Sequence, residues 1–242
     1  MISSSDGQVR RIELIPVTGI GAIVPGDVLS SVIAEAAGDL ILDGDVLVVT
    51  QKIVSKAEGR LVDVDPDDPL SHKAVVEAES VRVIRRRGDL IMSETRHGFV
   101  CANAGVDLSN VDRGQAALLP IDSDRSARKI RDGLRGRIGR NVGVVVSDTF
   151  GRAWRKGVVD VAIGVAGVAG VVDLRGTQDA LGRTLMVTEV CIADEIASAA
   201  ELVMGKSTGI PVAIVRGVDP EWLRNGSVVE EIVRPYSEDL FR

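Results

Sequence analysis

Acidic, hydroxyl and basic side chains are concentrated in one segment, residues 147–157, directly after the apolar run 142–146. A short β-branched run predicts a buried strand, so Asp148 and Thr149 should emerge at its carboxyl end, where sheet proteins commonly bind ligands. Three cations follow them, Arg152, Arg155 and Lys156. Oxygen ligands beside a cationic loop suit a metal-bound polyphosphate. The same residue types also fit an ordinary turn after a strand, and this segment alone does not decide between the two interpretations.

A second segment, residues 94–111, could supply further oxygen ligands. Its second half is small, polar and glycine-bearing, and it presents Asp107 and Asn110 from one loop. If the fold joins this loop to residue 148, the two aspartates could share a divalent cation, whereas an Asx turn is the alternative. His97 is expected to be a structural, hydrogen-bonded histidine. His97 and Glu94 are also the candidates for a general base.

Two glycine-containing motifs do not match nucleotide-binding loops. The stretch 205–208 resembles the tail of a P-loop, but Ala200 stands where that motif needs glycine, and the expected helix precedes the stretch instead of following it. Lys206 in this turn could still contact phosphate. Glycines also recur every third residue from 164 to 170 without dinucleotide-binding spacing, which favours close backbone packing.

The overall composition is that of an ordinary globular protein with a small-molecule partner. Of 242 residues 45% are hydrophobic, and a net charge of -6 with 2% aromatic residues argues against a nucleic-acid surface. Cys101 and Cys191 are expected to be reduced thiols. The longest apolar run, 161–172, is too short to cross a bilayer, and no signal peptide is evident at the start. We therefore expect a cytoplasmic protein without a membrane partner.

Strands and helices alternate without a strict βαβ rhythm, which predicts an α+β fold, a mixed β-sheet with flanking helices. The expected strands are 11–17, 45–50, 89–92, 98–102, one ending at Val146, and 210–215. The expected helices are 28–37, 71–87, 123–135 capped by Asp122 or Ser123, and 188–203 capped by Thr188. Residues 52–59 are expected to form a loop.

Five segments stand in the order and spacing of the coenzyme F420-0:γ-glutamyl ligase family, and the chain resembles that family over residues 11–242. The segments are 50–59, 98–110, 147–157, 173–176 and 193–200. The resemblance implies one ligase domain over 11–242, divisible into two subdomains, after a disordered or extended N-terminus at 1–10. The segment 234–242 is most similar to the actinobacterial form, in which a flavin-reductase-like domain often follows the ligase unit.

The resemblance implies a GTP-dependent ligase that joins coenzyme F420-0 to L-glutamate through an acyl phosphate, with γ-linked addition of further glutamates, in an intertwined homodimer. It implies manganese or magnesium, with potassium as an additional candidate. The metal ligands would be Asp107, Asp148 and Thr149. The GTP contacts would be Ile20, Gly21, Ala22, Ile23, Gln51, Lys56, Asn110 and Lys206. Since phosphoryl transfer needs cations that neutralise developing charge, Lys56, Arg152 and Arg155 are the candidate catalytic cations, and Arg175 is a further candidate.

The chain departs from the family pattern in two places. Many relatives have Leu-Pro-Glu-hydrophobic where residues 20–23 stand, and many have a Gly-Gln-Gly-Asp-Glu-Gly loop where 204–209 stands. These departures affect the residues that would contact the guanine base of GTP and any metal ligand that the second loop would supply. A metal-dependent phosphohydrolase and a non-catalytic deazaflavin-binding module are the alternative functions. The run 158–172 fits either a dimer interface or a core strand.

Overall fold

The computed structural model describes residues 11–239. The expected disordered or extended N-terminus at 1–10 lies outside the described residues, as do residues 240–242. Within the described part no helix is long and apolar enough to cross a membrane.

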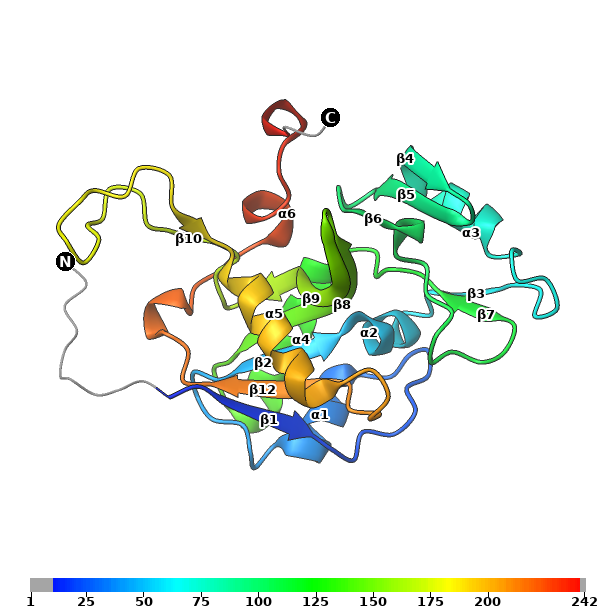
Figure 1. Cartoon of the computed structure of the whole chain (residues 1–242). Helices are drawn as coiled ribbons and strands as arrows, with labels where there is room; N and C mark the ends of the chain where they lie inside the picture. The colour runs from blue at the N-terminus through cyan, green and yellow to red at the C-terminus, as the bar shows by residue number, and fades with distance from the viewer. Residues whose placement is uncertain (1–10, 240–242) are drawn as a thin grey trace.

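A five-stranded mixed sheet forms the centre of the chain, in the order β1-β12-β2-β8-β9 (Figure 1). Its strands are β1 (Glu13–Val17), β12 (Val212–Arg216), β2 (Val46–Thr50), β8 (Gly143–Arg152) and β9 (Arg155–Ala166). Only β2 and β8 run parallel, and the other neighbours are antiparallel. The predicted mixed-sheet α+β fold is therefore confirmed.

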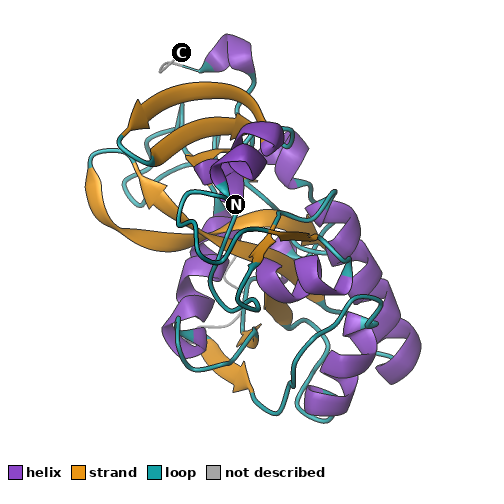
Figure 2. Cartoon of the chain, turned by 90° about the vertical axis from the view of Figure 1, so that its right-hand side faces the viewer, coloured by secondary structure: helices purple, strands orange, loops and turns teal. Residues whose placement is uncertain are grey.

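Helices cover both faces of this sheet (Figures 1 and 2). The helices α1 (Leu29–Ala37) and α4 (Ser123–Ile138) lie together on one face, and α5 (Ile192–Met204) lies on the other. Helix α4 begins as predicted at Asp122, whose carboxylate accepts a hydrogen bond from the Arg125 backbone N–H at 2.8 Å. It ends at Gly139, which adopts the left-handed conformation with φ 69°.

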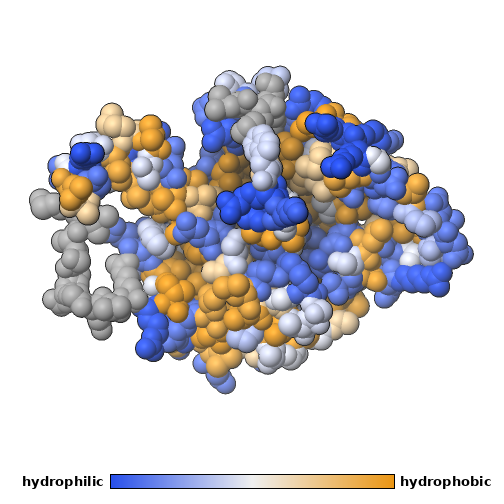
Figure 3. Space-filling model, viewed as in Figure 1, coloured by the Kyte–Doolittle hydropathy of each residue, from blue (hydrophilic) through white to orange (hydrophobic). Residues whose placement is uncertain are grey.

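A smaller unit projects beside the central sheet (Figure 1). It holds a three-stranded antiparallel sheet, and a two-stranded ladder joins it to the body. The elements are β3 (Leu61–Asp63), α3 (Lys73–Glu79), β4 (Ser80–Arg87), β5 (Leu90–Thr95), β6 (Val100–Ala102), the 3₁₀ turn η1 (Asn103–Gly105) and β7 (Gln115–Ala117). Hydrophilic side chains gather over this unit in the space-filling view (Figure 3). The loop with Asp107 lies between η1 and β7, so this unit carries one side of the site.

The predicted helix over 71–87 is wrong in its second half, because the chain turns into β4 at Ser80. From there the sequence Val-Arg-Val-Ile alternates with period two and is rich in β-branched residues, which favours a strand once β5 is available as a partner.

Two further sequence predictions also need correction. Residues 52–59 are not a loop, because α2 (Gln51–Ala57) starts directly after β2. Thr188 does not cap the next helix, since a short ladder of β10 (Val172–Asp173) and β11 (Glu189–Val190) intervenes and α5 begins after Cys191. In the case of Thr188 the pairing of β10 with β11 overrides the local pattern.

The strand predicted to end at Val146 continues as β8 to Arg152 and turns into β9, so the basic segment is a β-hairpin. The run from 160 to 166 forms the buried part of β9, which confirms the core-strand alternative for that part. The close packing expected of the spaced glycines is confirmed at Gly164, where an added Cβ would lie 2.3 Å from the Ser123 backbone carbon. The remaining short elements are η2 (Pro220–Trp222), α6 (Val228–Glu231) and η3 (Tyr236–Glu238).

Candidate functional site

The parallel pair β2 and β8 places polar side chains at one edge of the sheet. Thr50 at the end of β2 is in register with Ser147 of β8, so Lys52 and Asp148 follow at the same level. Carboxyl ends of parallel strands are where α/β sheets commonly bind ligands. The local sequence therefore brings an ammonium group and a carboxylate to one edge.

A cleft of ≈ 180 Å³ opens at this edge. Its lining combines cationic, acidic and small side chains from the loop after β1, from α2, from the β8–β9 ladder and from the loop after α5. The lining residues are Ile20, Gly21, Ala22, Ile23, Thr50, Lys52, Ile53, Lys56, Asn110, Thr149, Asp160, Glu201, Met204, Gly205, Lys206, Gly209, Ile210 and Pro211.

Asp107 is bound to the cleft by an ion pair. Its Oδ2 lies 2.7 Å from the Nζ of Lys52, and its Oδ1 accepts a hydrogen bond from the Ser109 backbone N–H at 2.7 Å. Burial opposes ionisation, but Lys52 and Ser109 outweigh it and lower the pKa of Asp107. The backbone of Asp107 also pairs with Ala117, which fixes the loop to β7.

Asp148 is the most perturbed carboxylate of the site. Its burial raises the pKa to about 7, against the opposing effects of the Thr149 backbone N–H and of Lys52. The charges of Asp107 and Asp160 raise it further. The structure thus places Asp107 and Asp148 close enough for their charges to interact, although neither carboxylate lines the cleft and their role as metal ligands stays a prediction.

Asp160 adds a third carboxylate, 3% exposed, from the strand opposite Asp148. Its Oδ1 accepts hydrogen bonds from Thr149 Oγ1 at 2.8 Å and from Lys206 Nζ at 2.6 Å, and its Oδ2 lies 3.4 Å from Ser147 Oγ. Burial opposes charge on Lys206, but hydrogen bonds to Asp160 and Glu201 outweigh it and raise the pKa of the ammonium. The floor of the cleft is therefore a network of alternating charges.

Most of the residues predicted to contact GTP line this cleft, and their role in binding the nucleotide stays a prediction. They are Ile20, Gly21, Ala22, Ile23, Lys56, Asn110 and Lys206. Gln51 does not line it. Its side chain is fully buried beneath α2 and accepts a hydrogen bond from Ser55 Oγ at 2.8 Å, because it is the first residue of a helix packed on the sheet.

The predicted catalytic arginines lie elsewhere. Arg152 and Arg155 flank the exposed tip of the β8–β9 hairpin and do not line the cleft, because β8 runs on past Thr149 instead of ending there. Arg152 donates to the Lys156 carbonyl at 3.1 Å. Arg175 makes a bidentate pair with Asp173, at 2.9 and 2.7 Å. Only Lys56 of the predicted catalytic cations borders the cleft.

The two candidates for a general base have structural partners. The Nε2 of His97 lies 2.9 Å from the Pro120 carbonyl oxygen, the ring stacks on Phe99, and burial lowers its pKa. Glu94 pairs with Arg82 at 3.2 Å. Neither residue lines the cleft.

Sequence reasoning missed three charged residues of the cleft: Lys52, Asp160 and Glu201. Lys52 carried a signal, because it precedes Lys56 by four residues and such a spacing places both on one side of a helix. Asp160 carried one as well, since it is a lone acid within an apolar run. Glu201 had no distinguishing signal among the acids of α5.

The donor set fits a hard divalent cation at Asp107 and Asp148. Carboxylate and hydroxyl oxygens are the ligands that Mg²⁺ and Mn²⁺ prefer. A buried carboxylate with a raised pKa, such as Asp148, is stabilised in its charged form by a nearby cation. Among residues 11–239 no group of three or more His, Cys, Asp or Glu side chains could hold a metal ion by itself. Water molecules or phosphate oxygens would therefore have to complete the coordination.

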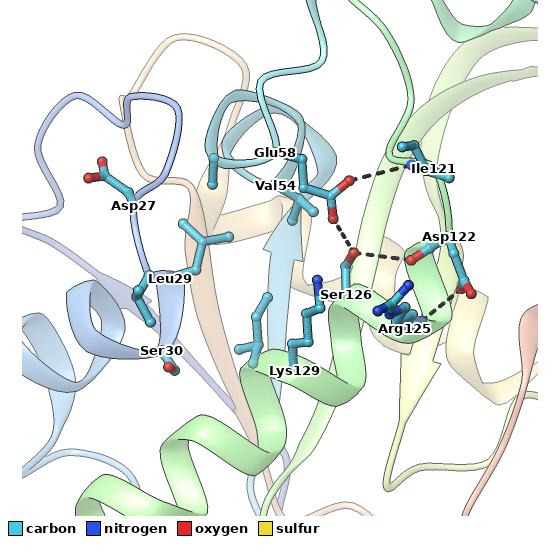
Figure 4. Close-up of a pocket in the computed structure, with 13 residues that line it drawn as sticks. Asp27, Leu29, Ser30, Val54, Glu58, Ile121, Asp122, Arg125, Ser126 and Lys129 are labelled. Carbon is cyan, nitrogen blue, oxygen red and sulfur yellow. Dashed lines mark hydrogen bonds between the residues drawn. The ribbon is translucent and has the colours of Figure 1, made fainter.

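A second cavity, which we call the helical pocket, lies between α1, α2 and α4 (Figure 4). It measures ≈ 480 Å³ and contains none of the predicted site residues. Glu58 crosses its upper rim, where it is hydrogen-bonded to Ser126 and to the Ile121 backbone N–H (Figure 4). Its walls are mainly apolar, whereas the cleft is lined by the charged side chains of Lys52, Asp160 and Lys206.

Comparison with known proteins identifies the class of enzyme. Residues 19–217 match the family model described as F420-0:Gamma-glutamyl ligase. The chain is 44% identical to the coenzyme F420:L-glutamate ligase of Methanothermobacter thermautotrophicus, over 96% of this chain and 99% of that protein. It is 43% identical to the protein of the same name from Methanopyrus kandleri, over 96% and 97% of the two chains. The chain is therefore a ligase. It belongs to the F420-0:γ-glutamyl ligase family.

Proposed function

We propose that this chain is a GTP-dependent ligase that forms an amide bond between coenzyme F420-0 and L-glutamate. The observation that supports the proposal is the cleft at the ends of β2 and β8, which Lys52, Asp160 and Lys206 line; the carboxylates of Asp107 and Asp148 both interact with Lys52. Oxygen ligands for a divalent ion and cations for phosphate are the two requirements of phosphoryl transfer.

In the proposed reaction the γ-phosphoryl group of GTP moves to the carboxylate of F420-0, its bond to the β-phosphate breaks, and GDP leaves. The amine of glutamate then attacks the acyl carbon, the new C–N bond forms, and phosphate leaves as the amine loses a proton. A bound Mn²⁺ or Mg²⁺ would supply positive charge beside the phosphate oxygens. Asp107 and Asp148 would hold this ion.

The side chains of the chain itself orient and neutralise the phosphates. Lys52 and Lys56 both border the cleft from α2, and a cation there offsets the negative charge that builds up on the transferred group. Asn110 adopts a left-handed backbone conformation, φ 56°, at the end of the loop that begins with Asp107. It would close the edge of the nucleotide site.

The size of the cleft bears on how the nucleotide is held. Its ≈ 180 Å³ is below the range of about 300–1,000 Å³ that encloses a whole ligand of this size. The cleft therefore suits the metal-bound phosphates, and the rest of the nucleotide would lie against a further surface. A second copy of the chain, as in the predicted homodimer, would provide such a surface.

Mass spectrometry tests the proposal directly. F420-0 incubated with the protein, GTP, glutamate and Mn²⁺ should gain stepwise glutamyl mass increments, and Asp148→Asn should abolish them. Asp132→Asn, on the exposed side of α4, is the matched control and should retain activity. Phosphate release that needs no glutamate would favour a phosphohydrolase, and coenzyme binding without GTP binding would favour a non-catalytic module. Either result would contradict the proposal.

A further inference from the structure

The ammonium group of Lys206 occupies a shell of three oxygens on the floor of the cleft. It lies 2.6 Å from Asp160 Oδ1, 2.6 Å from Thr149 Oγ1 and 2.8 Å from Glu201 Oε1. These oxygens come from β9, β8 and α5, so the shell is built by tertiary packing. Lys206 itself lies in the loop after α5, and its side chain is 50% exposed toward the cleft.

The shell is held rigidly by its neighbours. Thr149 and Asp160 face each other across the β8–β9 ladder, and the Thr149 hydroxyl donates to the Asp160 carboxylate. Ser198 of α5 donates to the Asp160 carbonyl oxygen at 2.7 Å, which fixes β9 against the helix that carries Glu201. Two carboxylates and a hydroxyl at fixed positions are the donors that a metal cation would also use.

Asp148 differs from this group. The positive charge of Lys52 acts on the Asp148 carboxylate from a distance, but among the described residues no ammonium group is hydrogen-bonded to it. The Asp160 carboxylate, by contrast, accepts a hydrogen bond from the Lys206 ammonium. Each region thus has one ammonium group, Lys52 at Asp107 and Lys206 at Asp160, and the Asp148 carboxylate is the one of the three to which neither ammonium group is hydrogen-bonded.

We propose, on the basis of the ligase function proposed above, that the Lys206 ammonium is a built-in cation that replaces a second divalent ion beside Thr149, Asp160 and Glu201. The chain then binds one divalent ion per nucleotide, at Asp107 and Asp148. Two-metal sites clamp phosphate oxygens from both sides. An ammonium group provides a single positive charge in the second position, and since its three N–H donors face the three oxygens of the shell, it would act on a nearby phosphate oxygen through its charge.

Counting bound Mn²⁺ by electron paramagnetic resonance, in the presence of a non-hydrolysable GTP analogue, tests this role without measuring turnover. The wild-type chain should bind one Mn²⁺. Lys206→Gln removes the ammonium and offers an amide oxygen in its place, so this variant should bind two. Lys129→Gln, in the helical pocket, is the matched control and should bind one.

Two Mn²⁺ ions in the wild-type chain would overturn the inference, and this measurement does not depend on any variant folding. A folded Lys206→Gln variant that still binds one ion, with an unchanged circular dichroism spectrum, would overturn it too. The ligase assay separates this result from the parent proposal. A chain that makes the glutamyl product but binds two ions refutes only the role of Lys206, whereas a chain that makes no product refutes the proposed function.

Discussion

Replacing Asp148 by asparagine should stabilise the metal-free protein at alkaline pH. The side chain is buried, and its pKa is raised to about 7 from the usual 3.8. A shift of that size corresponds to roughly 4 kcal/mol of preference for the protonated form in the folded state. The folded protein therefore resists ionisation of this carboxyl, whereas the unfolded chain ionises it freely.

The sign of the pH dependence follows from the raised pKa. Below pH 4 Asp148 is protonated in both states, and it contributes no difference between folded and unfolded protein. Between pH 4 and 7 only the unfolded chain releases the proton, so the free energy of unfolding falls by about 1.4 kcal/mol per pH unit through this group. Above pH 7 the loss is complete. An asparagine side chain does not ionise in this pH range, so the variant lacks this contribution to the pH dependence.

Urea unfolding of both proteins in a chelating buffer, from pH 4 to pH 8, measures the effect. The stability of Asp148→Asn relative to the wild type should rise with pH by about 4 kcal/mol in total, and any constant effect of the amide cancels from this difference. Added Mn²⁺ with a GTP analogue should stabilise the wild type at pH 8 and have much less effect on the variant. A difference that does not change with pH would refute the reasoning about burial.

Two more predictions concern packing and the thiols. Gly164→Ala should lower the free energy of unfolding by about 1–3 kcal/mol, because the new Cβ would meet the Ser123 backbone, whereas Gly136→Ala, in open space on α4, should raise it by about 0.5–1 kcal/mol in the same urea titration. Equal effects of the two changes would contradict the packing argument. Burial raises the pKa of both Cys101 and Cys191 to about 12, so a thiol reagent at pH 8 should modify the native protein roughly 1,000-fold more slowly than urea-unfolded protein. Rapid labelling of either native thiol would show that the burial is wrong.

Local signals in the sequence were sufficient where an element is stabilised by its own residues. The cap of α4 at Asp122 is an example, because the capping carboxylate and its partner Arg125 lie three residues apart. The strand β2 and the parallel placement of its end beside β8 give the site its position, and the apolar runs identified both strands. The family resemblance then predicted that Asp107 lies near Asp148. The spacing of apolar residues alone does not predict which loops come together.

Pairing across long distances explains what the sequence did not reveal. Asp160 reaches the site because β8 continues past Asp148 and folds back, so that Thr149 and Asp160 come into register. The same extension carries Arg152 out to the hairpin tip, and this one property of the strand accounts for both errors. Gln51 is buried because α2 starts without an intervening loop, and its amide lies beneath the helix and out of the cleft.

Helix α2 is only seven residues long, and it separates the cleft at the ends of β2 and β8 from the helical pocket. Lys52 and Lys56 line the cleft, whereas Val54 and Ala57 line the helical pocket. A compound bound in the helical pocket would contact α2 on the side opposite the cleft. It would shift Lys52 and Lys56 without occupying the space that they line. Screening for such compounds would need an assay other than displacement of a ligand from the cleft.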